Sequence, residues 1–276
     1  MQAALAQAAF AQASFVPAPT PQAAAARAET LRVVMGYELT WHGILVYRMS
    51  SEATIAPDFY RLGYSGTTLG LFDLLIDYRS HAEAAGRLAN GTSRPEHYRL
   101  DARWHGERRQ AVLDYGPDGQ VATHVVPPPE SEDIDPVPLP MRENTVDPLS
   151  AALLVGIDGG QDGAELCAGT TRVFDGRQRY DMKLENLGRV ELPKGERSAY
   201  SGPALKCRVT VLRLAGFSQG SFAEPQRPPT LVWLARVARN KIMLPVKIEI
   251  DTGLGAVDGT LTRLEIAGDG DRPKAP

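Results

Sequence analysis

The chain has 276 residues, which is enough for one large domain or two small ones with a full hydrophobic core. Its 30 basic and 33 acidic residues give a net charge of −3, and this near-balance argues against a nucleic-acid-binding protein. No apolar run reaches the length of about 18 residues that a transmembrane helix needs, so no transmembrane span is predicted.

The first 30 residues differ in composition from the rest of the chain. Alanine dominates them, and small residues at Ala9, Ala11 and Ala13 are spaced as at the cleavage site of a secretory signal peptide. We therefore expect residues 1–30 to be a signal-peptide remnant and flexible leader, and the protein to be exported to the periplasm. The alternative is an alanine-rich helix or tail without a targeting role.

From Leu31 onward the dominant hydrophobic period is two, which is typical of half-buried β-strands. The alternation is clearest between His97 and Trp104, where apolar residues occupy one face and charged residues the other. The predicted strands are 33–40, 44–50, 59–64, 76–84, 97–104, 110–115, 121–126, 171–174, 178–184, 205–214, 231–238, 246–250 and 261–266.

Short Gly-containing pairs between these strands predict tight turns. His42-Gly43 predicts one, and the Asp-Gly pairs 118–119, 175–176 and 258–259 predict hairpins. The charged segment 175–181 is interpreted as a hairpin held by Asp–Arg pairs, with a polar recognition patch as the alternative.

A proline-rich acidic stretch interrupts the strand pattern. Between residues 127 and 140 the chain has six prolines and four acidic residues, so it cannot join the interior of a sheet. We interpret 127–147 as a surface loop within one β-rich domain spanning 31–267, followed by a disordered tail at 268–276. A calcium site in this loop is the alternative, but the ligand spacing of known calcium loops is missing.

One short helix is predicted after this loop. Asp147 is a suitable capping carboxylate and Pro148 suits the first helical position, while Leu149, Ala152 and Leu153 place an apolar stripe on the helix. The predicted fold is therefore mainly β: a single domain of curved antiparallel sheet, open or spiral barrel-like, with one short helix.

The expected chemical state of the two cysteines depends on the compartment in which the protein resides. In an oxidising periplasm Cys167 and Cys207 should form a disulfide, whereas in the cytosol they would be buried thiols. Neither lies in a C-x-x-C pair or beside a histidine, which argues against a redox or nucleophilic role.

Several ordered segments resemble one known family. The chain is similar to the proteobacterial family catalogued as domain of unknown function 3108, over roughly residues 31–266. The resemblance implies an exported, envelope-associated β protein, akin to the curved-sheet folds of periplasmic lipoprotein carriers, and it implies no catalytic residue. The segments are 37–43 (YELTWHG), 147–154 (DPLSAALL), 167–169 (CAG), 173–181 (VFDGRQRYD) and 200–207 (YSGPALKC).

Catalytic and metal-binding patterns are weak in this sequence. Residues 216–220 match the G-x-S-x-G nucleophile elbow around Ser218, but prolines follow it and all five histidines precede it, so a glycine-rich loop is favoured. His81 and Glu83 share one strand face as two potential ligands, yet they are interpreted as solvated strand residues. No cofactor is predicted.

These observations predict a non-enzymatic periplasmic protein. Its curved sheet would bind a lipid-like or peptide ligand, or an envelope partner, with Tyr78, Tyr98 and Trp104 as candidate contacts. The same three residues could instead form a closed core. The alternatives are an envelope serine hydrolase acting through Ser218, and a purely structural scaffold without a cavity.

Overall fold

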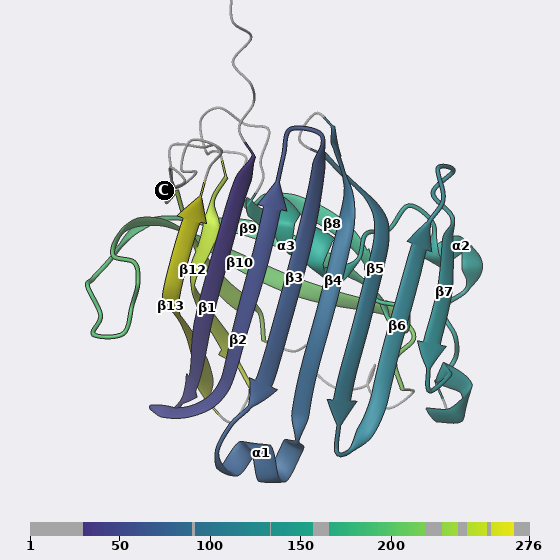
Figure 1. The fold of residues 1–276 in the computed structure, drawn as a ribbon, viewed down its shortest axis with the longest axis horizontal. Helices are drawn as coiled ribbons and strands as arrows, with labels where there is room; N and C mark the ends of the chain where they lie inside the picture. Colours follow the sequence, from purple (N-terminus) through teal and green to yellow (C-terminus); the bar gives the residue numbers. More distant parts are fainter. Residues whose placement is uncertain are drawn as a thin grey trace, which may run out of the picture.

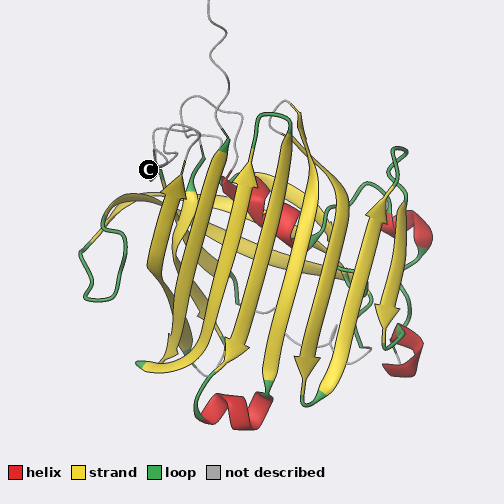
Figure 2. Ribbon diagram, in the orientation of Figure 1, coloured by secondary structure: helices red, strands yellow, loops and turns green. Residues whose placement is uncertain are grey.

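A computed structural model describes residues 30–89, 92–132, 134–156, 166–218, 228–236, 242–252 and 255–267. These residues form thirteen strands, three α-helices and one 3₁₀ helix (Figure 2). The helices are α1 (Leu71–Ile76), η1 (Pro129–Glu132), α2 (Leu139–Arg142) and α3 (Pro148–Gly156). The strands are β1 (Leu31–Trp41), β2 (Ile44–Ile55), β3 (Phe59–Thr68), β4 (Tyr78–Ala89), β5 (Thr92–Trp104), β6 (Glu107–Tyr115), β7 (Val121–Val126), β8 (Gly169–Phe174), β9 (Arg179–Leu192), β10 (Gly202–Ala215), β11 (Thr230–Ala235), β12 (Leu244–Asp251) and β13 (Ala256–Ala267).

All thirteen strands belong to one sheet with the order β7-β6-β5-β4-β3-β2-β1-β13-β12-β11-β10-β9-β8, and each pairing is antiparallel. The terminal strands β1 and β13 pair in the middle of the sheet, while β7 and β8 are its two edges. The predicted fold, a mainly β, open and curved antiparallel sheet, is therefore confirmed.

The sheet curves around its own interior (Figure 1). Strands β1–β7 lie across the front of the view, β8–β10 cross behind them, and α3 lies between these two layers. Contacts of α3 with β4, β5 and β8 agree with this placement. The sheet face that points toward α3 is called the inner face below, and the opposite one the outer face.

The alternation predicted for β4 and β5 is present in the structure. Ser80, Ala82 and Ala84 are buried on the inner face of β4, whereas Arg79 and His81 between and beside them are exposed. The period of two therefore places one apolar and one polar face on the same strand.

One predicted turn is wrong. Asp258 and Gly259 lie inside β13, where Gly259 packs against Ile248 of β12. The turn between these strands comes earlier, where Thr252 N–H donates to the Gly255 carbonyl at 3.2 Å and Gly255 has a φ of 118°. Long-range pairing thus overrides a local Asp-Gly turn signal at this position.

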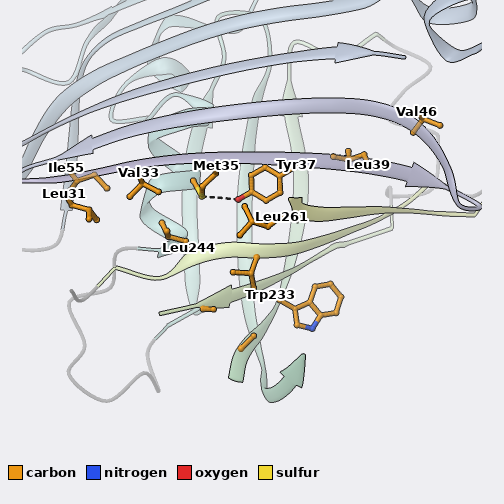
Figure 3. Close-up of a cluster of buried hydrophobic side chains, with 13 residues drawn as sticks. Leu31, Val33, Met35, Tyr37, Leu39, Val46, Ile55, Trp233, Leu244 and Leu261 are labelled. Atoms are coloured by element: carbon orange, nitrogen blue, oxygen red, sulfur yellow. Dashed lines mark hydrogen bonds between the residues drawn. The ribbon is translucent and has the colours of Figure 1, made fainter. Parts of the chain in front are cut away.

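The largest hydrophobic cluster lies around the β1–β13 pairing (Figure 3). Val33, Tyr37 and Leu261 are fully or almost fully buried in it, and Leu244 contributes from β12. The Tyr37 hydroxyl donates to the Pro245 carbonyl at 2.6 Å, so this buried polar group is satisfied. A second cluster fills the space inside β4–β7, and a third surrounds α3.

The predicted helix start is present, and the predicted apolar stripe is partly confirmed, because Leu149 and Leu153 pack against the hydrophobic clusters while Ala152 does not. Asp147 caps α3 as expected, whereas Ala152 is exposed and Leu149 and Leu153 are half-buried. Small residues instead provide much of the buried face, because α3 is packed closely inside the sheet: a Cβ on Gly156 would lie 2.2 Å from the Met243 carbonyl oxygen. The buried residues of α3 are Ser150, Ala151, Val155 and Gly156.

The described residues of 127–147 lie outside the thirteen strands, as predicted, but the segment is not wholly a surface loop, because Val137 and Thr145 are buried. It connects the two sheet edges. Asn144 N–H donates to the Gly119 carbonyl in the β6–β7 turn at 3.0 Å, and Val146 forms a parallel bridge with Val173 of β8. The β8–β9 turn is also close to β6, since a Cβ on Gly176 would contact Ala111 of that strand at 3.0 Å.

Two short helices, α1 and α2, were not predicted from the sequence. The predicted leader, most of it at residues 1–29, and the predicted tail at 268–276 lie outside the described residues. No helix within the described ranges is long and apolar enough to cross a membrane.

Candidate functional site

The three predicted ligand contacts lie on the inner face of neighbouring strands. Tyr78 of β4 is directly opposite Trp104 of β5, and Tyr98 is opposite Ala84 further along the same pair. The register therefore brings them to one face, but at two different depths.

Tyr98 lies deep in the interior. It is 3% exposed in the cluster that also contains Leu113 and Phe174, and burial raises the pKa of its hydroxyl. Tyr78 is half-buried, and its ring stacks on Tyr47 of β2 with the centroids 6.4 Å apart. These two residues pack against other interior side chains, so a ligand reaches Tyr98 only by entering the interior.

Trp104 is in a different environment. It is 44% exposed at the end of β5, and the Arg109 guanidinium lies 5.1 Å from the centre of its ring. This cation–π contact fixes the indole while leaving part of its surface in water.

Exposed apolar side chains gather at the end of the sheet where α1 projects beyond the strands (Figure 2); they come from α1, from the start of β2 and from the end of β5. Six of the nine large apolar side chains that are exposed among the described residues belong to it. Leu74 is 84% exposed and Leu71 68% exposed. We call this set the apolar end; it comprises Ile44, Leu71, Leu74, Leu75, Ile76 and Trp104.

Contacts to the sheet hold α1 in this position. Phe72 points back and packs edge-on against Trp41, with ring centroids 5.7 Å apart. The Thr68 hydroxyl donates to Asp73 at 2.9 Å, and the Ile76 carbonyl accepts from His105 N–H at 3.4 Å. The helix is thus anchored on its polar and aromatic side while its leucines face outward.

The sequence contains a local signal for this helix. Residues 69–76 read LGLFDLLI, in which Gly70 begins the helix with a φ of 60° and apolar residues recur at three- and four-residue spacing. The strand predicted at 76–84 begins on the last residue of this helix, and the pattern assigns no element to residues 65–75.

A buried network of polar side chains connects β3 with the start of α3. Asp147 is fully buried and accepts from the Leu149 and Ser150 N–H groups, both at 2.9 Å. Ser150 Oγ donates to Asp147 Oδ2 at 2.5 Å, so Tyr60 must donate its own hydroxyl proton to Ser150 Oγ, 2.7 Å away. Ser93 Oγ in turn donates to Tyr60 at 2.8 Å.

Burial governs the titration of this network. Desolvation raises the pKa of the Asp147 carboxyl, against the lowering effect of its hydrogen bonds with Ser150 and the backbone. It also raises the pKa of Tyr60 to about 12. The network joins β3, β5 and α3, and its geometry is that of a structural hydrogen-bond chain with no exposed member at Tyr60, Ser150 or Asp147.

The outer face of β4 and β5 carries a polar groove with a volume of about 800 Å³. Arg79, Arg99 and Arg103 line it together with His81, Glu83 and Asp101. Asp101 is engaged, because Arg108 and Gln110 donate to its Oδ2 at 2.6 and 2.8 Å, and these contacts lower the pKa of its carboxyl.

The cysteine pair forms the predicted disulfide. Cys167 and Cys207 are joined with a Cα–Cα distance of 5.8 Å, and both are buried beside α3. The segment 175–181 forms the predicted hairpin: Asp175 Oδ1 accepts from the Arg177 and Gln178 N–H groups at 2.8 and 2.7 Å, and Arg179 pairs with Asp181 at 2.7 Å.

Ser218 is exposed in the loop after β10, and the described chain is interrupted directly after it. The part of the predicted elbow from residue 219 onward therefore lies outside the described residues. His81 Nε2 lies 3.2 Å from Glu83 Oε1, both exposed. Within the described ranges, no group of three or more His, Cys, Asp or Glu side chains could hold a metal ion. Part of the acidic loop, including Asp133, is not among these residues.

Comparison with known proteins gives one family and one fold likeness. A family model described as a protein of unknown function (DUF3108) matches residues 36–262. The crystal structure of a β-barrel-like protein of the domain of unknown function DUF1849 from Brucella abortus is similar at 12% identity with a TM-score of 0.48, over 87% of this chain and 99% of that chain. No curated protein matches the sequence significantly.

Proposed function

The chain belongs to the DUF3108 family, and we propose that it is an exported, non-catalytic β protein that binds an apolar ligand or partner in the cell envelope through its apolar end. The disulfide between Cys167 and Cys207 supports export, because such bonds persist in oxidising compartments and are rare in the cytosol.

The exposure of the apolar end is the observation that carries this proposal. Full burial of one leucine side chain is worth about 1.5–3 kcal/mol, so Leu71, Leu74 and Leu75 together leave several kcal/mol of burial unused in water. A group of exposed apolar side chains at one end of a sheet is the kind of feature that marks an interaction site. Trp104 belongs to the apolar end, and Tyr78 lies directly opposite Trp104, so we retain these two predicted residues as ligand contacts.

A charge placed on α1 tests the site. Leu74→Asp should markedly reduce the fluorescence enhancement of the neutral apolar dye Nile red, because it places a carboxylate where the apolar phase would contact the helix. Leu139→Asp is the matched control, since Leu139 is 67% exposed but lies on α2. Equal dye binding by both variants and the wild type would exclude the apolar end as the binding site.

Export has its own test. Mass spectrometry of protein isolated from its host should find a mature N-terminus between Ala11 and Glu29. Intact Met1 in the cytosolic fraction would contradict the proposed localisation.

The absence of catalysis is tested with a serine-reactive activity probe. The proposal expects no labelling at Ser218. Labelling that disappears in Ser218→Ala would instead favour the envelope hydrolase.

A further inference from the structure

The strand register aligns basic side chains in one row across the outer face. Starting at β10, each residue of the row is the direct cross-strand partner of the next, over ten strands. Six of the ten are basic and one is acidic. The row comprises Lys206, Trp233, Lys247, Thr260, Glu38, Arg48, Thr67, Arg79, Arg103 and Arg108.

The two halves of the row differ in how their charges are neutralised. At one end, the Lys206 and Lys247 ammonium groups lie 5.0 and 4.7 Å from the ring centre of Trp233. In the middle of the row, the Glu38 carboxylate forms an ion pair with the Arg48 guanidinium at 2.9 Å. This half is therefore balanced by aromatic and carboxylate partners.

The other half places three arginines side by side. Arg79 of β4, Arg103 of β5 and Arg108 of β6 are directly opposite one another, an arrangement of like charges that destabilises a sheet. We call these three residues the arginine row. Such an arrangement is favourable when an anion lies across it.

Unneutralised charge in this region is concentrated on β5. Arg79 is 3.6 Å from Asp73, and Arg108 is engaged with Asp101. Neither Arg103 nor Arg99 forms an ion pair with a carboxylate of the described chain, and both line the outer-face groove. The positive charge is thus local, and it borders the outer-face groove.

The arginine row lies next to the apolar end. Arg79 and Arg108 are the second residues of their strands and Arg103 is the penultimate residue of β5, all at the end that carries α1 and Trp104. At about 3.3 Å per residue, the row lies about 3–7 Å from the strand ends. Interfacial protein segments bury their apolar side about 5–10 Å deep at a bilayer surface, so insertion of α1 would bring the row to the headgroups.

The tryptophan at this boundary fits the same geometry. Trp104 has one surface exposed and the Arg109 guanidinium over its ring, at the level between the leucines of α1 and the arginine row. Tryptophan and arginine are favoured at the interface between hydrocarbon and headgroups.

We propose that the apolar end docks onto the surface of an anionic phospholipid bilayer, with the leucines of α1 in the interface and the arginine row on lipid phosphates. This inference rests on the proposed function, because it requires the apolar end to be the binding surface. The recognised chemistry is an apolar layer bordered by phosphate, and Arg103 provides the unpaired guanidinium that contacts it.

Vesicle flotation of the full chain tests the inference. The probes are vesicles of phosphatidylcholine alone and vesicles of phosphatidylcholine with phosphatidylglycerol. A basic residue near an anionic surface contributes about fivefold in partitioning, so Arg103→Gln should lower binding to the anionic vesicles about fivefold and leave binding to phosphatidylcholine unchanged. Leu74→Asp should abolish binding to both.

Arg61→Gln is the matched control. Arg61 is exposed on the outer face of β3, where it is opposite Thr54 and near the other end of the strand. Its substitution should have no effect on either vesicle, and high salt should reduce binding only to the anionic vesicles.

The outcomes separate this inference from the proposed function. Equal binding of wild type and Arg103→Gln to the anionic vesicles would overturn the headgroup contact while leaving the apolar end in place. No vesicle binding, with Nile red binding still lost in Leu74→Asp, would overturn the bilayer as occupant and point to a protein partner. Loss of neither signal in Leu74→Asp would remove both proposals.

Discussion

Removing the Tyr60 hydroxyl tests whether the buried polar network stabilises the contact between the sheet and α3. Tyr60→Phe keeps the ring, which is fully buried, and so creates no large cavity. It deletes the bonds to Ser150 at 2.7 Å and to Ser93 at 2.8 Å. The two partners are 90 and 33 residues away in the sequence, so the hydroxyl links distant segments.

The expected loss in the free energy of unfolding is about 1–2 kcal/mol. A net contribution of about 0.5–1.5 kcal/mol for each bond gives about 1–3 kcal/mol for both. The lower part of this range is expected, because Ser93 is only half-buried and can find water, and Ser150 keeps its bond to Asp147.

Urea unfolding followed by circular dichroism measures this loss. A double-mutant cycle with Ser150→Ala should give a coupling free energy of about 0.5–1.5 kcal/mol between the two hydroxyls. Tyr200→Phe, which removes a bond from an exposed hydroxyl to the Pro203 carbonyl, should cost less. A Tyr60→Phe protein as stable as the wild type, or a coupling free energy of zero, would refute the assigned hydrogen-bond chain.

Three further predictions concern stability. Replacing Cys167 and Cys207 with serine opens a loop closed over a separation of 40 residues and should lower the free energy of unfolding by about 4 kcal/mol, measured by urea unfolding; a change below about 1 kcal/mol would contradict it. Burial raises the folded-state pKa of Asp147, so as pH rises from about 4 the unfolded state ionises first and stability declines. Asp147→Asn should therefore show a smaller decline between pH 4 and pH 7 than the wild type, and parallel pH profiles would count against the raised pKa. Gly66→Ala should cost about 1–3 kcal/mol by thermal unfolding, because its Cβ would overlap two tyrosine hydroxyls, whereas Gly63→Ala on the same strand has room and should be neutral.

The sequence predicts the strands well because the alternation of β4 and β5 depends only on local spacing. Tyr98 and its neighbours differ in polarity from the residues between them, and one buried face makes that difference visible. Asp147 and Pro148 are similarly local signals, since a cap acts within one helical turn.

Two features that depend on neighbours distant in the sequence were not predicted. The stripe on α3 was assigned by apolar character, but the close approach of Met243 selects the small face that includes Gly156. The arginine row exists only through register: Arg79 and Arg103 are 24 positions apart, and nothing in either local segment indicates that they are opposite each other.

The candidate site also contains one part that was predicted from the sequence and one part that was not. Trp104 was identified from its place at the end of an alternating strand, and it belongs to the apolar end. The leucines of α1 were not predicted, because a run of six residues is too short for its periodicity to distinguish a helix from a strand.

The pairing of β1 with β13 has a consequence for the order in which the protein folds. Every other neighbouring pair of strands in the sheet is consecutive in the chain. Strands β1–β7 and strands β8–β13 can therefore each form hairpin by hairpin as synthesis proceeds. One of the two neighbours of β1, strand β13, is the last of the thirteen described strands along the chain, and until it is made β1 has one unpaired edge in the middle of the future sheet. Chains truncated before Ala256 would keep that edge open, which makes aggregation through β1 their expected fate.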